Sequence, residues 1–473
     1  MLSRILLVSA SALTLSGCIT MAPRYEQPDA PVPSVLPEGD APDGIDVTGV
    51  DWRQVVTSPA LTELIETALE NNRDLRVAML NVQAARSQFG ITRSARFPSL
   101  SASVSQTEQG LMDDDDPDVD PIVAQTLSTD QARAQLAVTA YELDLFGRVT
   151  SLNRAALQSY LSQEENARAA ELSLIASVAN GWLNLVANNR LYQLAEETAG
   201  SQEQSLELTK ALFDAGVADD LDYQRAVTSV EQAKADRARF AAQRRQSLNA
   251  LMVLTGAPVS DDLLDRAADD FTPLRLDLTV GQSSDILLTR PDVQAAERTL
   301  MARNANIGAA RAAFFPRISL TGSAGYASTD LDGLFSDGTG YWSFTPQISL
   351  PIFAGGANWS NLRLAKTQRD IALAQYEKSI QNAFRETADA LAVAATIDER
   401  IAALERLTEA AQRAQFLSEE RLRGGVSDYL SVLDAQRQVY QAQQALISAR
   451  AERASNAVAL YLAVGGATPV ASN

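Results

Sequence analysis

The sequence predicts an α+β fold made mostly of long α-helical hairpins, with four β-strands that contribute to a transmembrane β-barrel. Three observations predict this fold. Very long stretches carry apolar residues at helical spacing, four segments of about ten residues alternate between apolar and polar side chains, and the whole order occurs twice. The chain is therefore expected to consist of two similar halves, each with a helix, two strands and a long helical hairpin.

The first eighteen residues predict export and a lipid anchor. Arg4 precedes a short apolar run that ends at Leu15-Ser16-Gly17-Cys18. A spanning helix needs about 20 apolar residues, so we assign residues 1–17 to a signal peptide. Cys18 is the only cysteine in 473 residues, which excludes an intrachain disulfide. The motif resembles a bacterial lipobox, whose cysteine carries lipid; a buried or reactive cysteine is the alternative.

Composition excludes several classes of function. The chain has 40 basic and 59 acidic residues, a net charge of −19, and no histidine. A chain this acidic repels a phosphate backbone, so we expect no nucleic-acid partner. Without histidine or a free cysteine, the usual zinc ligands, Ser-His-Asp and Cys-His catalysis and redox dithiols are missing. We expect no enzyme activity, no metal site, and no cofactor beyond a covalent lipid on Cys18.

Residues 18–50 are rich in proline and poor in apolar side chains, which predicts an extended N-terminal tether. The first repeat is assigned to residues 51–260. It begins with a helix expected over 61–96, which ends at Phe97-Pro98 because proline disfavours helical geometry in the residue before it.

Alternation with period two predicts four strands. They are expected at about 98–109, 131–146, 316–328 and 341–353. The clearest run has Trp342, Phe344 and Ile348 alternating with polar residues. Strands of about ten residues with an apolar outer face and a polar inner face fit a transmembrane barrel. A half-buried soluble sheet shows the same alternation and remains an alternative at this point.

Four long segments read as helices, namely 151–214, 221–255, 358–423 and 429–464. Their apolar residues recur at spacings of three and four, as in a coiled coil. A helix of about 64 residues reaches roughly 95 Å at 1.5 Å per residue, so an elongated chain is expected. Glycine-bearing turns near 214–220 and 423–428 join the helices into two antiparallel hairpins.

The duplication is visible when the two halves are compared. Gly90 and Phe97 match Gly308 and Phe315, 218 residues later. Further matches, at other offsets, are Phe146 with Phe353 and Gly216 with Gly425. The second repeat is therefore assigned to residues 261–473.

At this point the residues resemble the outer membrane factors, the TolC-type channels, within the lipidated branch that serves resistance-nodulation-division pumps. The resemblance rests on Tyr25-Glu26-Gln27-Pro28, Leu143-Asp144-Leu145-Phe146-Gly147 and the stretch from Leu430 to Gln436, in this order. It implies a homotrimeric outer membrane channel of a tripartite efflux pump, which conducts small molecules passively. A twelve-stranded barrel in outer membrane lipid and a periplasmic α-barrel are expected. The partners would be a periplasmic adaptor, or membrane fusion protein, and an inner membrane transporter.

The resemblance also implies functional residues. Asp434, Asp222 and Asp428 fall where the family has its periplasmic gate. The hairpin tips that would contact the adaptor are marked by Gly216, Val217, Gly425 and Val426. Ordinary solvated carboxylates are the alternative reading of Asp434 and Asp222. A tyrosine and an arginine that lock the gate in one family pattern are replaced here by Leu422 and Ser427, so Arg421 and Arg423 are possible substitutes.

Three other functions remain to be weighed. Export of proteins by type I secretion shares this fold, although the predicted lipid favours drug or metal efflux. A structural periplasmic coiled-coil lipoprotein would explain the helices and Cys18, but not the strands or the duplication. A carboxylate-based hydrolase would need paired carboxylates in a compact domain, for which the sequence has no candidate.

Overall fold

The computed structural model describes residues 20–37, 45–46, 49–109, 129–259, 263–267, 270–281 and 283–466. The predicted signal peptide, Cys18 and the sequence Asp113-Asp114-Asp115-Asp116-Pro117-Asp118 between the first two predicted strands lie outside the described residues. The chain divides into two units, each built from both repeats. Unit 1 contains the chain up to Pro28, Gln83–Ser162 and Glu297–Ala374, and unit 2 contains Asp29–Val82, Gln163–Ala296 and Gln375–Asn473.

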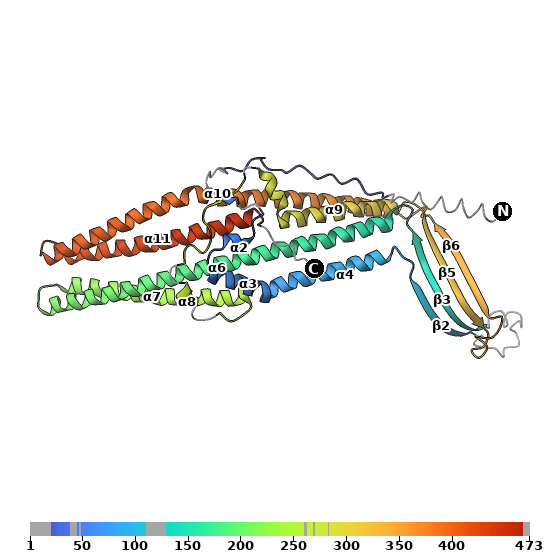
Figure 1. Ribbon diagram of the computed structural model, residues 1–473, viewed down its shortest axis with the longest axis horizontal. Helices are drawn as coiled ribbons and strands as arrows, with labels where there is room; N and C mark the ends of the chain where they lie inside the picture. The colour runs from blue at the N-terminus through green and yellow to red at the C-terminus, as the bar shows by residue number, and fades with distance from the viewer. Residues whose placement is uncertain are drawn as a thin grey trace. The chain divides into compact units, whose positions relative to one another are not determined.

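The elements alternate as the duplication predicts (Figure 1). In chain order they are β1 (Ile45–Asp46), α2 (Trp52–Val55), α3 (Pro59–Asn71), α4 (Arg73–Ser94), β2 (Leu100–Gln109), β3 (Thr129–Leu143), α6 (Arg148–Asp214), α7 (Asp220–Thr255), α8 (Leu263–Arg266), β4 (Leu278–Thr279), the 3₁₀ helix η1 (Ser284–Thr289), α9 (Pro291–Ala312), β5 (Arg317–Ser328), β6 (Gly340–Ser349), α10 (Ala357–Arg423) and α11 (Tyr429–Ala463).

The predicted helical hairpins are confirmed. Helices α6 and α10 each have 67 residues, and each is followed after a short turn by a helix of about half that length. In the first hairpin, Gly181 of α6 lies against the side chain of Leu251 in α7, where an added Cβ would be 2.9 Å from Leu251 Cδ2. In the second hairpin, Ile397 and Ile401 of α10 pack with Ala449 of α11.

The prediction of one helix over 61–96 is wrong, because the chain breaks between α3 and α4 at Asn72. Asn72 has an extended backbone, with ψ of 131°. Its side-chain oxygen accepts a hydrogen bond from the Leu75 backbone N–H at 2.9 Å, as an N-cap of α4 does. Its side-chain nitrogen donates to the Leu254 carbonyl at 2.8 Å and so ties the break to α7. The pattern of apolar residues alone does not reveal this cap.

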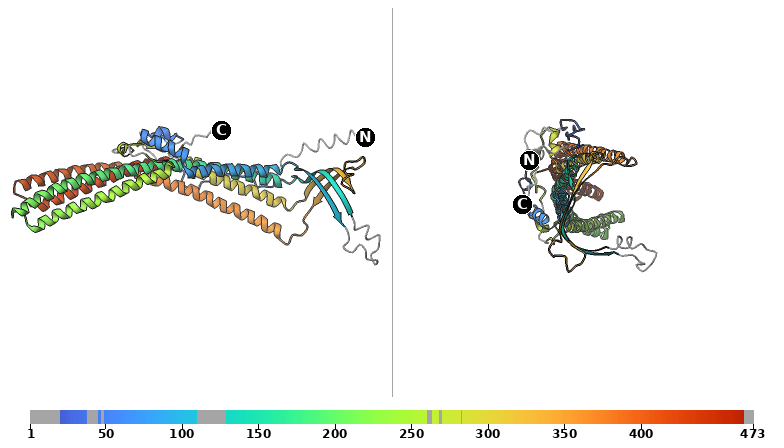
Figure 2. Two further views of the ribbon diagram at one scale, coloured as in Figure 1. Left: turned by 90° about the horizontal axis from the view of Figure 1, so that it is seen from below. Right: turned by 90° about the vertical axis from the view of Figure 1, so that its right-hand side faces the viewer.

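Unit 1 contains a four-stranded antiparallel sheet in the order β2-β3-β5-β6, which is curved in Figure 2. The register aligns the alternating residues across all four strands, so one face is mainly apolar and the other mainly polar. One face carries Leu100, Ala102, Val104, Ala134, Leu136, Val138, Ile318, Leu320, Ala324, Trp342, Phe344 and Ile348. The opposite face carries Ser101, Ser103, Ser105, Arg133, Gln135, Ser319, Thr321, Ser323, Ser343, Thr345 and Gln347.

Strand β3 contains a bulge that the sequence pattern does not predict. The register with β5 shifts between Val138 and Tyr141, and Ala140 has a positive φ of 49°. The bulge turns the odd-numbered Tyr141 and Leu143 onto the apolar face, opposite Leu320 and Ile318. Strand β3 also ends at Leu143 rather than near residue 146, and β6 ends at Ser349 rather than near 353.

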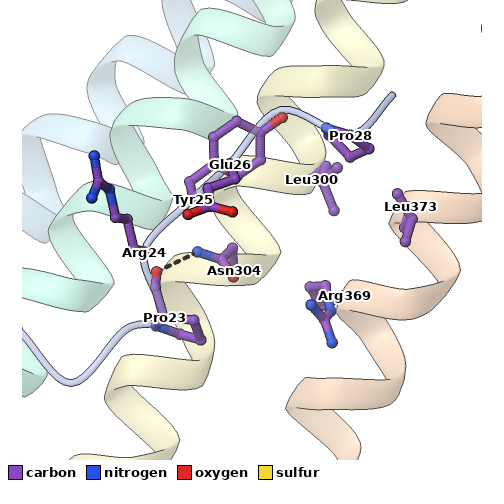
Figure 3. Close-up of a pocket in the computed structure, with 9 residues that line it drawn as sticks. All are labelled: Pro23, Arg24, Tyr25, Glu26, Pro28, Leu300, Asn304, Arg369 and Leu373. Carbon is purple, nitrogen blue, oxygen red and sulfur yellow. Dashed lines mark hydrogen bonds between the residues drawn. The ribbon is translucent and has the colours of Figure 1, made fainter. Parts of the chain in front are cut away.

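The N-terminal segment from Thr20 to Pro28, here called the strap, is extended as expected for a tether but is bound along its length. Asn304 of α9 donates to the Pro23 carbonyl at 2.8 Å (Figure 3). Arg311 of α9 donates to the Met21 carbonyl at 3.0 Å. Tyr25 donates to Glu297 at 3.0 Å. Side chains of α9 therefore hold these residues of the predicted extended tether, and its composition alone does not indicate these contacts.

The helices of unit 2 share a buried apolar core. Its largest members include Trp182 and Leu185 of α6, Leu251 of α7 and Tyr376 of α10, all below 2% exposure. One stretch of α6 is apolar and long enough to cross a membrane by composition. Full burial of Trp182 and Leu185 in the protein explains that composition as the core face of a packed helix.

Candidate functional sites: the two-faced sheet and the hairpin tips

The apolar face of the sheet is uncovered in the single chain. Trp342, Phe344 and Ile348 are 78%, 60% and 69% exposed. A contiguous apolar patch of this kind is not stable against water and indicates contact with lipid or protein. The opposite face carries hydroxyls and amides that bond across strands, such as Ser323 to Ser343 at 2.7 Å and Tyr341 to Gln135. This division is that of a transmembrane barrel, with lipid outside and water inside.

The sheet ends on both sides in a strand that has a partner on one side only. Strand β2 pairs with β3, and β6 pairs with β5, within the described residues. Each outer edge therefore presents a row of free backbone N–H and C=O groups. In lipid such groups cost several kcal/mol each, so a membrane-inserted sheet must close on itself or on copies of itself.

The two hairpin tips have the same local structure in both repeats. Gly216 and Gly425 adopt left-handed conformations with φ of +73° and +67°. The next residues, Val217 and Val426, donate back to the carbonyls of Leu212 and Arg421, which closes the last helical turn. Val217 is 74% exposed and Val426 is 67% exposed. Each tip thus presents one exposed valine on a turn that backbone hydrogen bonds close.

One aspartate caps the second helix of each hairpin, Asp219 in α7 and Asp428 in α11. Asp219 accepts from the Asp222 backbone N–H at 2.8 Å. Asp428 accepts from the Ser431 hydroxyl at 2.7 Å and from its backbone N–H at 3.1 Å. These bonds lower the pKa of Asp428, and the nearby Arg225 guanidinium of α7 adds to the effect. Asp428, predicted as a gate residue, therefore has a structural partner in its own helix.

The other two predicted gate carboxylates also interact within their helices. Asp222 lies 3.5 Å from Arg225, and Asp434 lies 3.4 Å from Arg437. The side chains of Asp222 and Asp434 are 29% and 51% exposed. Among the described residues, neither carboxylate forms an ion pair with a residue of another helix in the same chain.

The predicted substitutes for the gate lock differ from each other. Arg423 forms ion pairs with Glu419 and Glu420 of its own helix, α10. Arg421 is exposed, and among the described ion pairs it has no partner. Among the ion pairs of the described residues, neither arginine is paired with Asp222 or Asp434, so these pairs do not form the predicted lock within one copy.

A buried polar layer in unit 2 was missed by the sequence reasoning. Gln202 of α6 donates to Gln436 of α11 at 2.9 Å, and both side chains are more than nine-tenths buried. Among the described residues, the Gln202 side-chain oxygen has no hydrogen-bond partner. Tyr440 of α11 donates to Asp236 of α7 at 3.4 Å, and burial raises the pKa of Tyr440 to about 12. The signal that could have revealed this layer is a glutamine among apolar residues at helical spacing, such as Gln436 between Val432 and Val439.

Comparison with known proteins decides the family. The sequence model of the family described as Outer membrane efflux protein matches residues 64–257 and 283–466, one segment in each repeat. The chain belongs to the outer membrane efflux protein family. The two matched segments confirm the internal repeat that the sequence predicts.

Relatives of this family resemble the chain over nearly its whole length. A probable efflux pump outer membrane protein of Pseudomonas putida, TtgC, is 44% identical and covers 98% of this chain and 96% of its own. Outer membrane protein OprJ of Pseudomonas aeruginosa is 42% identical, with coverage of 96% and 94%. The open state of the MtrE outer membrane channel of Neisseria gonorrhoeae superposes with a TM-score of 0.85, at 38% identity, over 95% of this chain and 98% of that one.

The protein is therefore an efflux family member of the outer membrane, with the fold of the TolC-type channels. The family is one of efflux channels, not of enzymes.

Proposed function

We propose that the chain is the outer membrane channel of a tripartite efflux pump and conducts small molecules passively from periplasm to exterior. The observation that carries this proposal is the four-stranded sheet with one apolar face, one hydroxyl-rich face and two open edges. The polar face would line a water-filled duct. Energy would come from an inner membrane transporter, because a water-filled duct has no means of driving transport.

Closure of the barrel requires further copies of the chain. The smallest bacterial transmembrane barrels have about eight strands, and one chain supplies four. Three copies would give the twelve strands that the resemblance to the outer membrane factors implies. The resemblance also implies an α-helical barrel in the periplasm, built from the long hairpins of three copies.

Asp434 is the residue that we propose for a charged ring at the periplasmic entrance. Its half-exposed carboxylate is held by a single weak pair with Arg437, so it can face a water-filled pore. Three such carboxylates around one axis raise the local concentration of cations. Asp222, whose pair with Arg225 is of the same kind, and Asp428 are proposed to stabilise the neighbouring helix ends of the gate.

The hairpin tips are proposed as the surface that contacts the periplasmic adaptor. Val217 and Val426 are small, exposed apolar groups on turns fixed by Gly216 and Gly425. An apolar partner surface would bury both valines, which favours association. Because the two tips of one chain are alike, a ring of three chains would present six similar contacts.

Lipid on Cys18 is proposed as an accessory anchor. The strap begins two residues later and is fixed to α9, so the anchor would hold the lipid close to unit 1. Barrel strands insert through their own apolar face, so Cys18→Ser should lower the amount in the outer membrane while conductance per channel remains within about twofold. Membrane fractionation with single-channel recording measures both quantities, and loss of conductance in inserted protein would contradict the accessory role.

The oligomeric state tests the proposal. Protein extracted from outer membranes should migrate as a heat-sensitive trimer on a denaturing gel without boiling, and as a monomer of about 50 kDa after boiling. A water-soluble monomer after removal of the signal peptide and lipid would refute it.

A further inference from the structure

In unit 1, the first repeat contacts the second through a strand pair, an aromatic stack and a close approach of two helices. Strand β3, the second strand of the first repeat, pairs with β5, the first long strand of the second repeat. Next to it, Phe146 stacks on Phe315 with ring centroids 4.9 Å apart. Below it, Gly308 of α9 approaches α6 so closely that an added Cβ would lie 2.6 Å from Ser151 Oγ.

The repeat equivalents of these groups are exposed or uncrowded within the part of the chain that the structure describes. Phe353, the equivalent of Phe146, is 89% exposed, and Phe97, the equivalent of Phe315, is 65% exposed. Gly90, the equivalent of Gly308, has no heavy atom within 4 Å of an added Cβ. The strands that carry the equivalent edges, β6 and β2, are the two open edges of the sheet.

We propose that a second copy of this chain completes this contact in a defined register, with Phe353 of one copy stacked on the partner subunit's Phe97. This inference rests on the proposed closure of the barrel by copies of the chain and adds the residues that close it. The β6 edge of one copy pairs with the β2 edge of the next, as β3 pairs with β5 inside one copy.

The register follows from the repeat. Leu143 lies opposite Ile318 and Glu142 lies opposite Ser319. The step from Phe146 to Phe353 is 207 residues and the step from Phe97 to Phe315 is 218. Moving the first residue of a pair forward by 207 and the second back by 218 places Ser349 opposite Ser101 of the partner subunit. Two residues along the antiparallel pair, Gln347 then lies opposite Ser103 of the partner subunit.

The chemistry of the two edges agrees with this register. This register aligns Ile348 with Ala102 of the partner subunit, and both residues belong to the apolar face. A slip by one residue would place apolar side chains of β6 beside the polar face of β2. A slip by two preserves the faces but separates Phe353 from Phe97 of the partner subunit by about 7 Å more along the strand. The aromatic pair therefore selects one register.

A copy of the chain satisfies the open edges where lipid cannot. Lipid offers no hydrogen-bonding groups to the free N–H and C=O groups of β2 and β6. The β2 edge with Phe97 and the β6 edge with Phe353 lie on opposite sides of the sheet and are complementary to each other. Copies of the chain would therefore associate head to tail. Such contacts form a closed ring when the rotation between copies completes a circle.

Cysteine pairs test the register. Gln347→Cys combined with Ser103→Cys should form disulfides between chains under mild oxidation, giving covalent dimers and trimers on a non-reducing gel. The shifted pair, Gln347→Cys with Ser105→Cys, should remain monomeric, because residues two positions out of register have Cα atoms about 7–8 Å apart. Each single variant controls for disulfides through Cys18. Ala137→Cys with Ser323→Cys, which are opposite each other in β3 and β5, should link within one chain.

The outcomes separate this inference from the proposed function. Heat-sensitive trimers whose shifted pair forms the covalent oligomers, instead of the matched pair, would overturn the register but leave the channel intact. Absence of any trimer would overturn both. Covalent trimers from the matched pair alone would support the register.

Aromatic substitutions provide a second measurement. Phe353→Ala and Phe97→Ala should each lower the temperature at which the trimer dissociates on a gel, and the double variant should be no worse than the more severe single one. Phe335→Ala is the matched control, because Phe335 is 73% exposed and lies at the other end of the sheet. Additive losses from two independent sites, or an equal loss from the control, would contradict the stacked pair.

Discussion

Gln436→Leu should destabilise the helical part of the protein more than its size change suggests. The Gln202 side-chain nitrogen donates to Gln436 at 2.9 Å in a buried layer, and the Gln202 oxygen already has no partner. Replacing Gln436 leaves a second buried polar group unsatisfied, which costs about 1–3 kcal/mol. Replacing both residues by leucine removes both donor and acceptors, so we expect the double variant to be within about 1 kcal/mol of the wild type.

The assay is thermal unfolding of detergent-purified protein, followed by far-ultraviolet circular dichroism at one scan rate. The single variant should unfold several degrees below the wild type, and the double variant Gln202→Leu/Gln436→Leu should recover most of the difference. Gln438→Leu is the control, because Gln438 is exposed on the same helix. A double variant that unfolds at or below the temperature of the single one would refute the reasoning, since the pair would then not be coupled.

Three further predictions concern the gate, the tips and alkaline stability. Asp434→Ala should reduce cation selectivity in single-channel recordings, because it removes three carboxylates from the proposed entrance; unchanged selectivity and opening would remove Asp434 from the gate. Val426→Glu should weaken pull-down of the adaptor, by about tenfold for the loss of one buried valine, and should leave channel conductance unchanged; unchanged adaptor binding would exclude this tip. Tyr440 has its pKa raised to about 12, so its contribution to stability is present below pH 10 and is lost as pH rises towards 12. Tyr440→Phe should flatten the fall in unfolding temperature between pH 10 and 12, and an unchanged slope would contradict this.

The barrel strands were predictable because a sheet with lipid on one side and water on the other imposes strict alternation. Trp342, Phe344 and Ile348 make that alternation plain. The bulge at Ala140 was not predictable, because small residues precede it and the change of phase appears only at Tyr141 and Leu143. Packing against β5 sets where the extra residue lies, and that partner is more than 170 residues away in the chain.

The long helices were predictable from their periodicity, but their interruptions and buried contacts were not. Asn72 ends α3 through a bond to Leu254, and Gln202 bonds Gln436 across 234 positions of sequence. Such partners follow from how helices pack against each other, which apolar spacing alone does not determine. The gate residues came only from the family resemblance, since Asp222 and Asp434 have the sequence character of ordinary helix-surface carboxylates.

Conductance of the purified trimer in a planar lipid bilayer tests most directly whether the protein is a passive channel. We expect stepwise openings of uniform size, with cations preferred over anions in a salt gradient. Trimer that enters the bilayer without carrying current under any applied voltage would contradict a channel function.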